Sequence, residues 1–398
     1  MNVSATVCRV CGSDTLQFLH RPRVPVHQNL VCDDRETAVG MTRGELRLRV
    51  CPRCAFAFNA AFDPALLSYG HQYDNSQQCS SAFREYADEL VNHLVNERGV
   101  RDARVLEVGC GNGAFLTAVV EADAGNIGYG FDPSYRGPAT ASGNRIRFER
   151  RFYDEHGGVQ ADVVICRHVI EHVSYPLGLL TSVRRALERS PGAAVYFETP
   201  CLEWILRNQV IWDFFYEHCS YFTERALRLA FEMSGFSVES VRHVFGGQYL
   251  WIEAAAGDPG VREGDHHGDD VRQIALEFTH AEGTIAARWR RYVQEARARG
   301  KVAIWGAGAK GVTFANLVDP DAELIDCVAD LNPHKQGRFL PGTGHPIVDY
   351  RELDRRGVRV AVLMNPNYRE ENESLLQQAG VEIELVELAA FDHQGTCG

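Results

Sequence analysis

The chain has 398 residues, of which 45% are hydrophobic and 10% aromatic, and its formal net charge is −12 at pH 7. This length exceeds one ordinary core and predicts two or three domains. The negative charge disfavours nucleic acid as a partner, because phosphates would be repelled without a local basic patch. No apolar run approaches the ~20 residues of a membrane-spanning helix, so no membrane partner is expected. The first residues, MNVSATVCRVCG, lack the basic-then-apolar pattern of a secretion signal, which predicts a cytoplasmic location.

Four of the twelve cysteines form two C-x-x-C pairs, with 39 residues between the pairs: Cys8, Cys11, Cys51 and Cys54. Each pair can put two thiolates on one turn, and two such turns complete a tetrahedral zinc site. Because four protein ligands leave no open position for a reactive water, we expect the zinc to be structural. Free or redox-active thiols are the alternative, although a thioredoxin-like motif would need a βαβ context that is absent here. Between the pairs, residues 45–50 alternate as a strand does.

Two polar segments flank this region. Residues 23–29 carry polar side chains and are stiffened by Pro22 and Pro25, which is unlike a simple core segment. Residues 69–80, which include Tyr73, lead into a predicted helix over 80–98. The second segment either lies across the mouth of a neighbouring pocket or is a solvated linker.

A glycine-rich stretch over residues 103–113 follows. A short apolar strand is succeeded by Glu107, Gly109, Gly111 and Gly113 and then by an apolar helical segment. Such a turn lets backbone amides approach a ligand at a helix N-terminus. About nineteen residues on, the next strand ends in Asp132, whose carboxylate can accept two ribose hydroxyls. The stretch resembles motif I of class I S-adenosylmethionine (SAM) methyltransferases. A glycine-rich turn in an unrelated α/β protein is the alternative.

Strand and helix patterns alternate around this motif. The predicted strands cover residues 104–109, 127–131, 145–150, 162–169 and 194–199, and two predicted helices cover 115–120 and 176–187. This alternation predicts an α/β fold with a doubly wound parallel sheet and a ligand at the carboxyl ends of its strands. The fourth strand ends in Arg167, a candidate cofactor-binding residue. Glu171 and His172 follow it, with a cofactor-side or structural role expected.

An aromatic cluster over residues 212–223 comes after the fifth strand and contains Tyr216, Glu217 and His218. Aromatic side chains with an acid and a histidine in such a loop favour a pocket lining, and a packed aromatic loop is the alternative. Thr223 is then expected to cap a helix, and residues 237–244 and 246–255 to form a hairpin.

The last part begins with a turn-rich linker over residues 257–270, followed by an amphipathic helix up to Arg299. A second glycine motif comes next, with Gly306, Gly308 and Gly311 after a strand and Asp330 at the end of a later strand. By pattern this is a dinucleotide fingerprint. Since two nucleotide-binding starts occur in one chain, one of them must be a decoy or a substrate site.

Three features together resemble the three-domain SAM-dependent C-methyltransferases of nucleotide-linked deoxysugars. These are the paired C-x-x-C turns, the SAM motif with F-Y-E-H-C-S-Y-F-T, and W-G-A-G-A-K-G with N-P-H-K-Q-G-R-F-L-P-G-T. The resemblance runs from Cys8 to about Leu388. It implies a structural zinc domain over 1–75, a Rossmann-like SAM-binding domain over 76–256, and a second Rossmann-like domain over 257–398. In that family the last domain closes over the substrate and helps hold its nucleotide, so the first glycine motif is assigned to SAM.

The resemblance also implies the catalytic residues. His218 corresponds to the base, with Tyr216 and Glu217 beside it, and Tyr73 matches a tyrosine ahead of the helix that enters the middle domain. Residues 25–29 and 74–81 depart from the pattern of the sugar enzymes where the substrate is expected. The reaction type is therefore better supported than the identity of the small-molecule acceptor. An O-methyltransferase and a non-catalytic nucleotide-sensing module remain alternatives.

Overall fold

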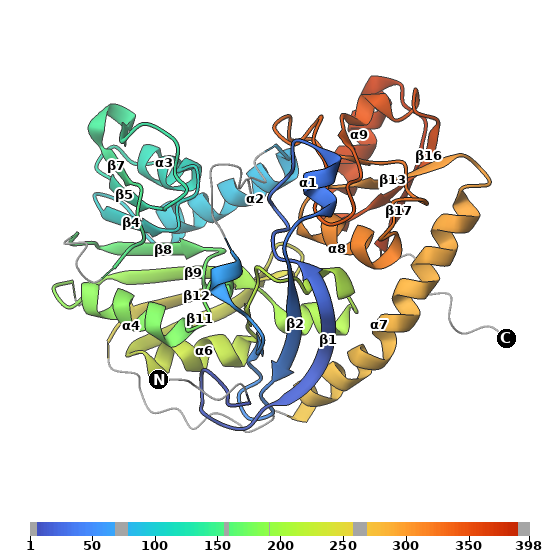
Figure 1. Cartoon of the computed structure of the whole chain (residues 1–398). Coiled ribbons are helices and arrows are strands. Elements are labelled where there is room, and N and C mark those ends of the chain that lie inside the picture. Colours follow the sequence, from blue (N-terminus) through green and yellow to red (C-terminus); the bar gives the residue numbers. More distant parts are fainter. Residues whose placement is uncertain (1–5, 68–78, 155–158, 191, 258–268, 389–398) are drawn as a thin grey trace.

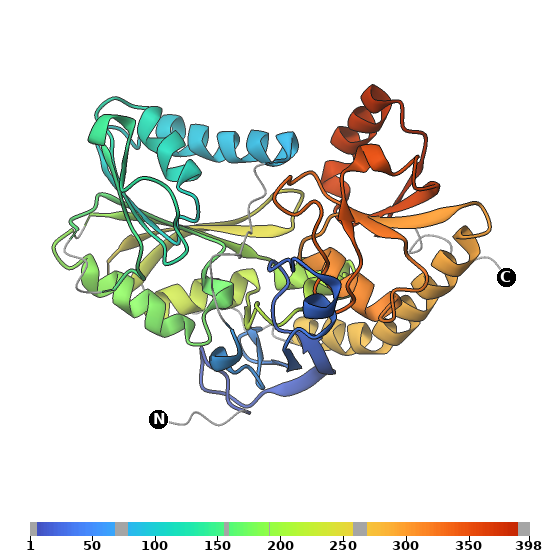
Figure 2. The ribbon, with the colours of Figure 1, turned by 45° about the horizontal axis from the view of Figure 1, so that its top comes forward.

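The computed structural model describes residues 6–67, 79–154, 159–190, 192–257 and 269–388, and three sheets are formed by this part of the chain (Figure 1). The eight-stranded and the five-stranded sheets lie on opposite sides, and the N-terminal strands lie between and below them (Figure 2). None of the helices that are described is both long and apolar enough to cross a membrane. The cytoplasmic location and the three domain boundaries stay predictions.

The smallest sheet is antiparallel and contains the predicted alternating strand. Its order is β1 (Leu16–Pro25), β2 (Arg43–Val50), β3 (Ala57–Asn59) and β10 (Ser220–Tyr221). Buried and partly exposed side chains alternate along β2, as the sequence predicted. Helix α1 (Arg35–Val39) and the short helix η1 (Pro64–Leu66) lie in its connections. Because β10 lies in sequence between β9 and β11 of the central sheet, the chain of the central region contributes a strand to this smaller sheet.

The central sheet has the order β11-β12-β9-β8-β4-β5-β7-β6. Its five middle strands are parallel, namely β9 (Ala194–Pro200), β8 (Val163–Arg167), β4 (Arg104–Val108), β5 (Ile127–Phe131) and β7 (Ile146–Glu149). The predicted hairpin is present as β11 (Phe236–Val244) and β12 (Tyr249–Ala256). The two-residue edge strand β6 (Thr140–Ala141) was not predicted.

Helices surround this sheet where the apolar periodicity predicted them. They are α2 (Ser81–Asn92) with its π-helical continuation η2 (His93–Glu97), α3 (Ala114–Glu121), α4 (Pro176–Ala186) and α6 (Glu224–Met233). Helix α5 (Leu202–Arg207) was not predicted. The short helices η3 (Ser142–Asn144), η4 (Ile170–His172) and η5 (Ile211–Asp213) complete the connections. Thr223 caps α6 as expected, because its side chain accepts from the Ala226 amide. The α/β fold with a doubly wound sheet is confirmed.

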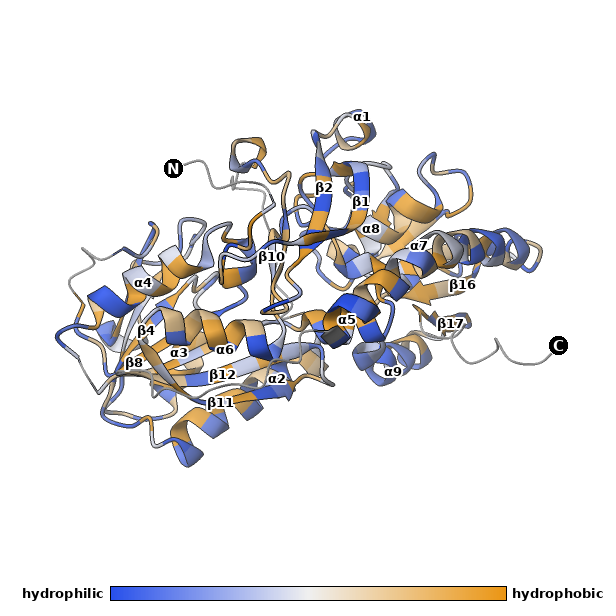
Figure 3. Ribbon diagram, turned by 90° about the horizontal axis from the view of Figure 1, so that it is seen from below, coloured by the Kyte–Doolittle hydropathy of each residue, from blue (hydrophilic) through white to orange (hydrophobic). Residues whose placement is uncertain are grey.

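The third sheet is entirely parallel and has the order β15-β14-β13-β16-β17. Its strands are β15 (Ile347–Val348), β14 (Cys327–Ala329), β13 (Lys301–Trp305), β16 (Val358–Leu363) and β17 (Glu384–Glu387). Its helices are α7 (Asp269–Ala296), α8 (Ala309–Val318) and α9 (Arg369–Ala379), with η6 (Tyr350–Glu352) and η7 (Pro366–Tyr368) between them. Figure 3 shows α9 as mostly hydrophilic, in keeping with its outer position.

The segment between β9 and α6 contacts strand β1, the turn after β8 and helix α8, and so reaches all three sheet regions. Arg21 of β1 donates to the carbonyls of Ile211 (2.6 Å) and Phe214 (2.7 Å). The Trp212 ring packs on Phe314 of α8, with 4.8 Å between the ring centroids. These contacts fix the position of the loop that carries His218.

Candidate functional site

The first glycine loop and the strand after it meet as the sequence predicted. Gly109, Gly111 and Gly113 all have positive φ, at 73°, 54° and 81°. A Cβ on Gly109 would lie 2.2 Å from a methyl carbon of Val169, so the close packing there requires glycine. The Gly111 amide donates to the Asp132 carboxylate at 2.9 Å. Loop and acid therefore lie together at the carboxyl ends of β4 and β5.

Glu107 points toward the same region from within β4. Its side chain is buried, and its Oε2 has no hydrogen-bond partner in the described part of the chain. Burial raises the pKa of Glu107 to about 7. An orphaned buried acceptor next to a glycine loop suits a polar cofactor that brings its own donors. The glycine loop, Asp132 and Glu107 thus fit SAM.

Arg167, the remaining predicted cofactor residue, belongs to a buried ionic network. Its Nε lies 2.5 Å from Glu198, and its guanidinium stacks over Phe115, the second residue of α3, at 4.2 Å. Tyr86 also donates to Glu198. Burial alone would raise the pKa of Glu198, but the charges of Arg167 and His168 lower it to about 2. Arg167 therefore anchors this carboxylate beside the glycine loop.

His168 completes the network with a left-handed backbone, at φ 54°. Its ring nitrogens lie 3.4 Å from Glu171 and 3.4 Å from Glu198. Burial alone would lower the pKa of His168, but the two carboxylates raise it to about 9. An imidazolium between two buried carboxylates balances charges that would otherwise be costly to bury. Sequence analysis missed this residue, although it directly follows Arg167, which was named as a candidate.

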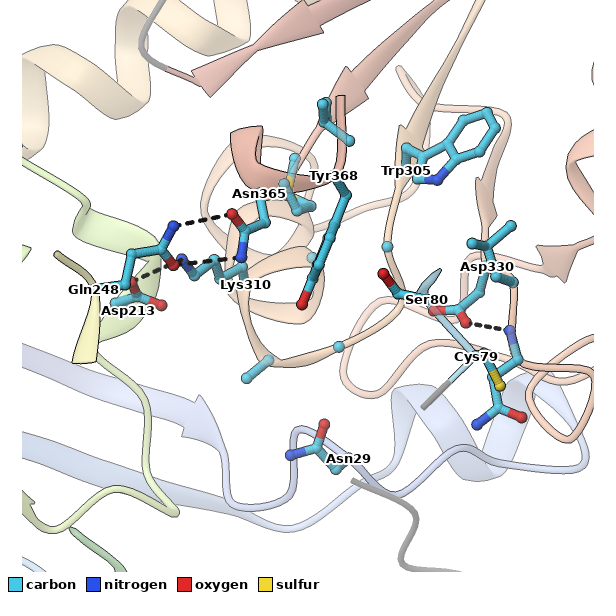
Figure 4. A pocket seen from close by; sticks show the side chains of 18 of the residues that line it. Asn29, Cys79, Ser80, Asp213, Gln248, Trp305, Lys310, Asp330, Asn365 and Tyr368 are labelled. Carbon is cyan, nitrogen blue, oxygen red and sulfur yellow. Dashed lines mark hydrogen bonds and ion pairs between the residues drawn. The ribbon is translucent and has the colours of Figure 1, made fainter. Parts of the chain in front are cut away.

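A cavity of about 250 Å³ lies between the three sheet regions. Its wall combines residues from all three sheet regions: Asn29, His168, Glu171, Phe215, His218, Gln248, Gly306, Gly308, Lys310, Gly311, Asp330 and Lys335. Figure 4 shows the part formed by the C-terminal region and its neighbours. Residues of the first glycine loop do not line this cavity.

His218 lies on the cavity wall and is held there by the turn after β8. The Cys219 amide donates to the Glu171 carbonyl at 2.9 Å, and His172 Nδ1 lies 3.0 Å from the Glu217 carbonyl. Burial, and next the charge of His172, hold the pKa of His218 well below its usual value. The ring has no hydrogen-bond partner in the described residues, so a neutral imidazole faces the cavity. Glu171 and His172 thus hold the His218 loop, which is one of the two roles expected for them, and Glu171 also lines the cavity.

The side chains beside His218 are placed differently from the prediction. Tyr216 does not line the cavity, because its hydroxyl contacts the backbone nitrogen (2.9 Å) and oxygen (3.2 Å) of Asp63. Phe215 lines it instead. Glu217 faces the N-terminal region, where it accepts from the Gln28 amide at 2.8 Å. Tyr73 lies outside the described residues.

The second glycine loop also lines the cavity. The Ala307 amide donates to Asp330 at 2.7 Å, as the Gly111 amide does to Asp132 in the first loop. A Cβ on Gly311 would lie 1.9 Å from the Gly306 carbonyl oxygen. Lys335 donates to the Ala307 carbonyl, and Lys310 pairs with Asp213 at 3.0 Å. Sequence analysis did not single out these lysines, although both lie in the quoted motifs.

The four paired cysteines form one cluster. The Cys8 and Cys54 sulfurs are 3.5 Å apart, the Cys11 and Cys51 sulfurs are 3.4 Å apart, and all four lie within 4.8 Å of one another. Zn–S bonds of about 2.3 Å in a tetrahedron put the sulfurs about 3.8 Å apart, so the cluster fits zinc. Gly12 and Ala55 follow the second cysteine of each pair, and both have a left-handed backbone conformation, with positive φ.

The His168 network predicts a pH dependence of stability. Because folding raises the pKa of His168, protonated His168 stabilises the folded state. This contribution is fully present below the pKa of the unfolded chain, about 6.5, and is lost as the pH rises through 9. The difference in free energy of unfolding between wild type and His168→Asn should therefore shrink between pH 6.5 and 9. Asparagine tolerates the left-handed backbone. Urea unfolding across this range measures the difference, with exposed His280→Asn as the control. Parallel curves for wild type and His168→Asn would contradict the charge assignment.

Comparison with known families covers both Rossmann-like regions. Residues 80–241 match the family described as a methyltransferase domain, and residues 262–383 match the C-methyltransferase C-terminal domain. The chain is also 29% identical over 364 residues to the C-methyltransferase NovU of Streptomyces niveus, covering 85% of this chain and 84% of that protein.

Other similarities are shorter. A ubiquinone biosynthesis O-methyltransferase of Aliivibrio fischeri strain MJ11 is 29% identical over 113 residues, or 27% of this chain and 47% of that enzyme. The SAH-bound magnesium protoporphyrin IX methyltransferase of Synechocystis PCC 6803 aligns with a TM-score of 0.36 and 19% identity, over 47% of this chain and 90% of that one. Both family matches and the near full-length relative agree: the chain is a SAM-dependent methyltransferase that is similar to C-methyltransferases over most of its length.

Proposed function

We propose that this enzyme methylates a carbon next to a keto group, in a nucleotide-linked deoxysugar or a related biosynthetic intermediate. The observation that carries the proposal is His218, a neutral imidazole without a hydrogen-bond partner among the described residues, on the wall of a cavity that the second glycine loop also lines. A base and a nucleotide-type loop on one cavity suit an acceptor that is activated at one end and held at the other.

The two glycine loops then have separate tasks. Glu107, Gly109, Gly111, Gly113 and Asp132 hold SAM, whose sulfonium supplies an electrophilic methyl group. The second loop, which contains Gly306, Gly308 and Gly311, holds the nucleotide of the acceptor. The lysines at this wall, Lys310 and Lys335, suit an anionic ligand such as a diphosphate. Arg167 supports the SAM loop through Phe115 and Glu198.

His218 acts as the base. A carbon beside a ketone becomes nucleophilic only after it loses a proton, and a neutral imidazole within the cavity can take that proton. Methyl transfer is an in-line displacement, so the remaining task of the protein is alignment of the two ligands. The backbone contacts of Glu171 and His172 keep the His218 loop in position. The enolate oxygen needs a hydrogen-bond donor, and we assign this role to Tyr73, since Tyr216 contacts Asp63 instead.

A first test replaces the base. His218→Asn should keep SAM binding and fold but lose about 10²–10⁴-fold in turnover, because general-base assistance is removed. The assay uses SAM and a thymidine diphosphate-linked 4-keto-6-deoxysugar, with the product analysed by mass spectrometry and NMR. Wild type should also exchange the acidic hydrogen for deuterium without SAM.

The matched control is His280→Asn, a substitution of an exposed histidine on α7, which should leave turnover unchanged. Near wild-type turnover in His218→Asn would remove this residue from the mechanism. A methyl group found on oxygen would keep the histidine but establish an O-methyltransferase instead.

A second test concerns the zinc, which we propose is bound by Cys8, Cys11, Cys51 and Cys54. Protein purified without chelator should contain one zinc per chain. Cys51→Ser should lose the metal and destabilise the N-terminal sheet, because metal binding and folding of such a site are coupled. Elemental analysis and thermal unfolding measure both effects, with Cys79→Ser as the control. Absence of zinc from the wild-type protein would rule out the metal.

A further inference from the structure

Asn29 is a buried polar side chain that lacks a partner. Its exposed fraction is 6%, it lines the cavity, and its carboxamide makes no hydrogen bond to the residues that the structure describes. In Figure 4 it stands apart from the hydrogen-bonded group of Gln248, Asn365 and Lys310. A carboxamide offers two donors and one acceptor with two lone pairs, and buried polar groups are nearly always bonded. Its partner is therefore expected to be a ligand.

The segment before Asn29 is held firmly by the loop of His218. The Gln28 amide donates to Glu217 Oε2 at 2.8 Å, and the Glu217 amide donates back to Gln28 Oε1 at 3.4 Å. Gln28 Nε2 also donates to the Pro25 carbonyl at 2.5 Å. Glu217 is fully buried, so this exchange is shielded from water. The backbone of Asn29 is thereby fixed relative to His218.

The third sheet region closes the segment from the other side. A Cβ on Gly342 would lie 2.6 Å from the Pro25 ring, and Arg43 donates to the Gly342 carbonyl at 2.8 Å. Residues 25–29 are therefore packed between the His218 loop and the C-terminal region. This segment departs from the sequence pattern of the sugar enzymes. Its residue on the cavity wall, Asn29, can therefore determine which acceptor binds.

We infer that Asn29 is an acceptor-recognition residue, whose carboxamide hydrogen-bonds a hydroxyl or carbonyl group of the molecule to be methylated. Gln28 and Glu217 are positioning residues for it. The identity of the acceptor, though not the recognition role, rests on the proposed function. A site built to bond a polar group discriminates strongly against analogues that lack the group, because its own buried atoms are then left unpaired.

The first test needs no substrate. Asn29→Leu replaces the carboxamide by an apolar side chain of similar size, and no internal hydrogen bond is lost. Its Tm should equal or exceed that of wild type, because an unsatisfied buried group is removed. The matched control is Gln28→Leu, which loses its side-chain hydrogen bonds and should have a lower Tm. A fall in the Tm of Asn29→Leu comparable with that of Gln28→Leu would make Asn29 a structural residue and overturn the inference.

The second test uses the thymidine diphosphate-linked 4-keto-6-deoxysugar as the probe. Asn29→Leu should lose at least about 10-fold in kcat/KM for this acceptor, with the Kd for SAM changed less than about twofold. Unchanged kcat/KM would overturn the inference. If wild type does not methylate the probe, the proposed acceptor class is wrong, and the Tm comparison alone decides the role of Asn29.

Discussion

The site depends on the loop between β9 and α6, because this loop packs against all three sheet regions at once. Its strand β10 pairs with β3, its carbonyls accept from Arg21, and Trp212 packs on Phe314. Loops usually vary in conformation more than the elements that they connect. Here the loop is held along its length, and His218 is consequently fixed at a cavity that no single sheet could form.

The two glycine loops share the same hydrogen-bonding arrangement. Each follows a parallel strand, and each has an amide that donates to the acid at the end of the next strand, Asp132 in one case and Asp330 in the other. Their surroundings differ. A buried carboxylate with an orphaned oxygen, Glu107, faces the first loop, whereas the second loop has a paired lysine, Lys310, and lines the cavity with His218. In the function proposed above, these surroundings suit the first loop to SAM and the second loop to an anionic acceptor.

Periodicity and glycine spacing predicted the central sheet, the hairpin of β11 and β12, the Thr223 cap and both glycine loops, because these depend on local sequence. The pairing of β10 with β3 could not be predicted, because it joins residues that are far apart in the chain. The paired stretch is also only two residues long on each strand. The side chains around His218 were also beyond sequence reasoning. A shift of one position decides whether Phe215 or Tyr216 faces the cavity, and the partner of Glu217 lies 189 residues away in Gln28.

The most direct test of the account asks which loop binds which ligand. Calorimetry would compare wild type, Asp132→Ala and Asp330→Ala with SAM and with thymidine diphosphate. Loss of a charge-assisted hydrogen bond costs about 1.5–3 kcal/mol, or roughly 10–150-fold in Kd. Asp132→Ala should weaken SAM by this amount and leave thymidine diphosphate unchanged, whereas Asp330→Ala should do the reverse. SAM binding that is lost in Asp330→Ala and retained in Asp132→Ala would contradict the assignment of the two loops.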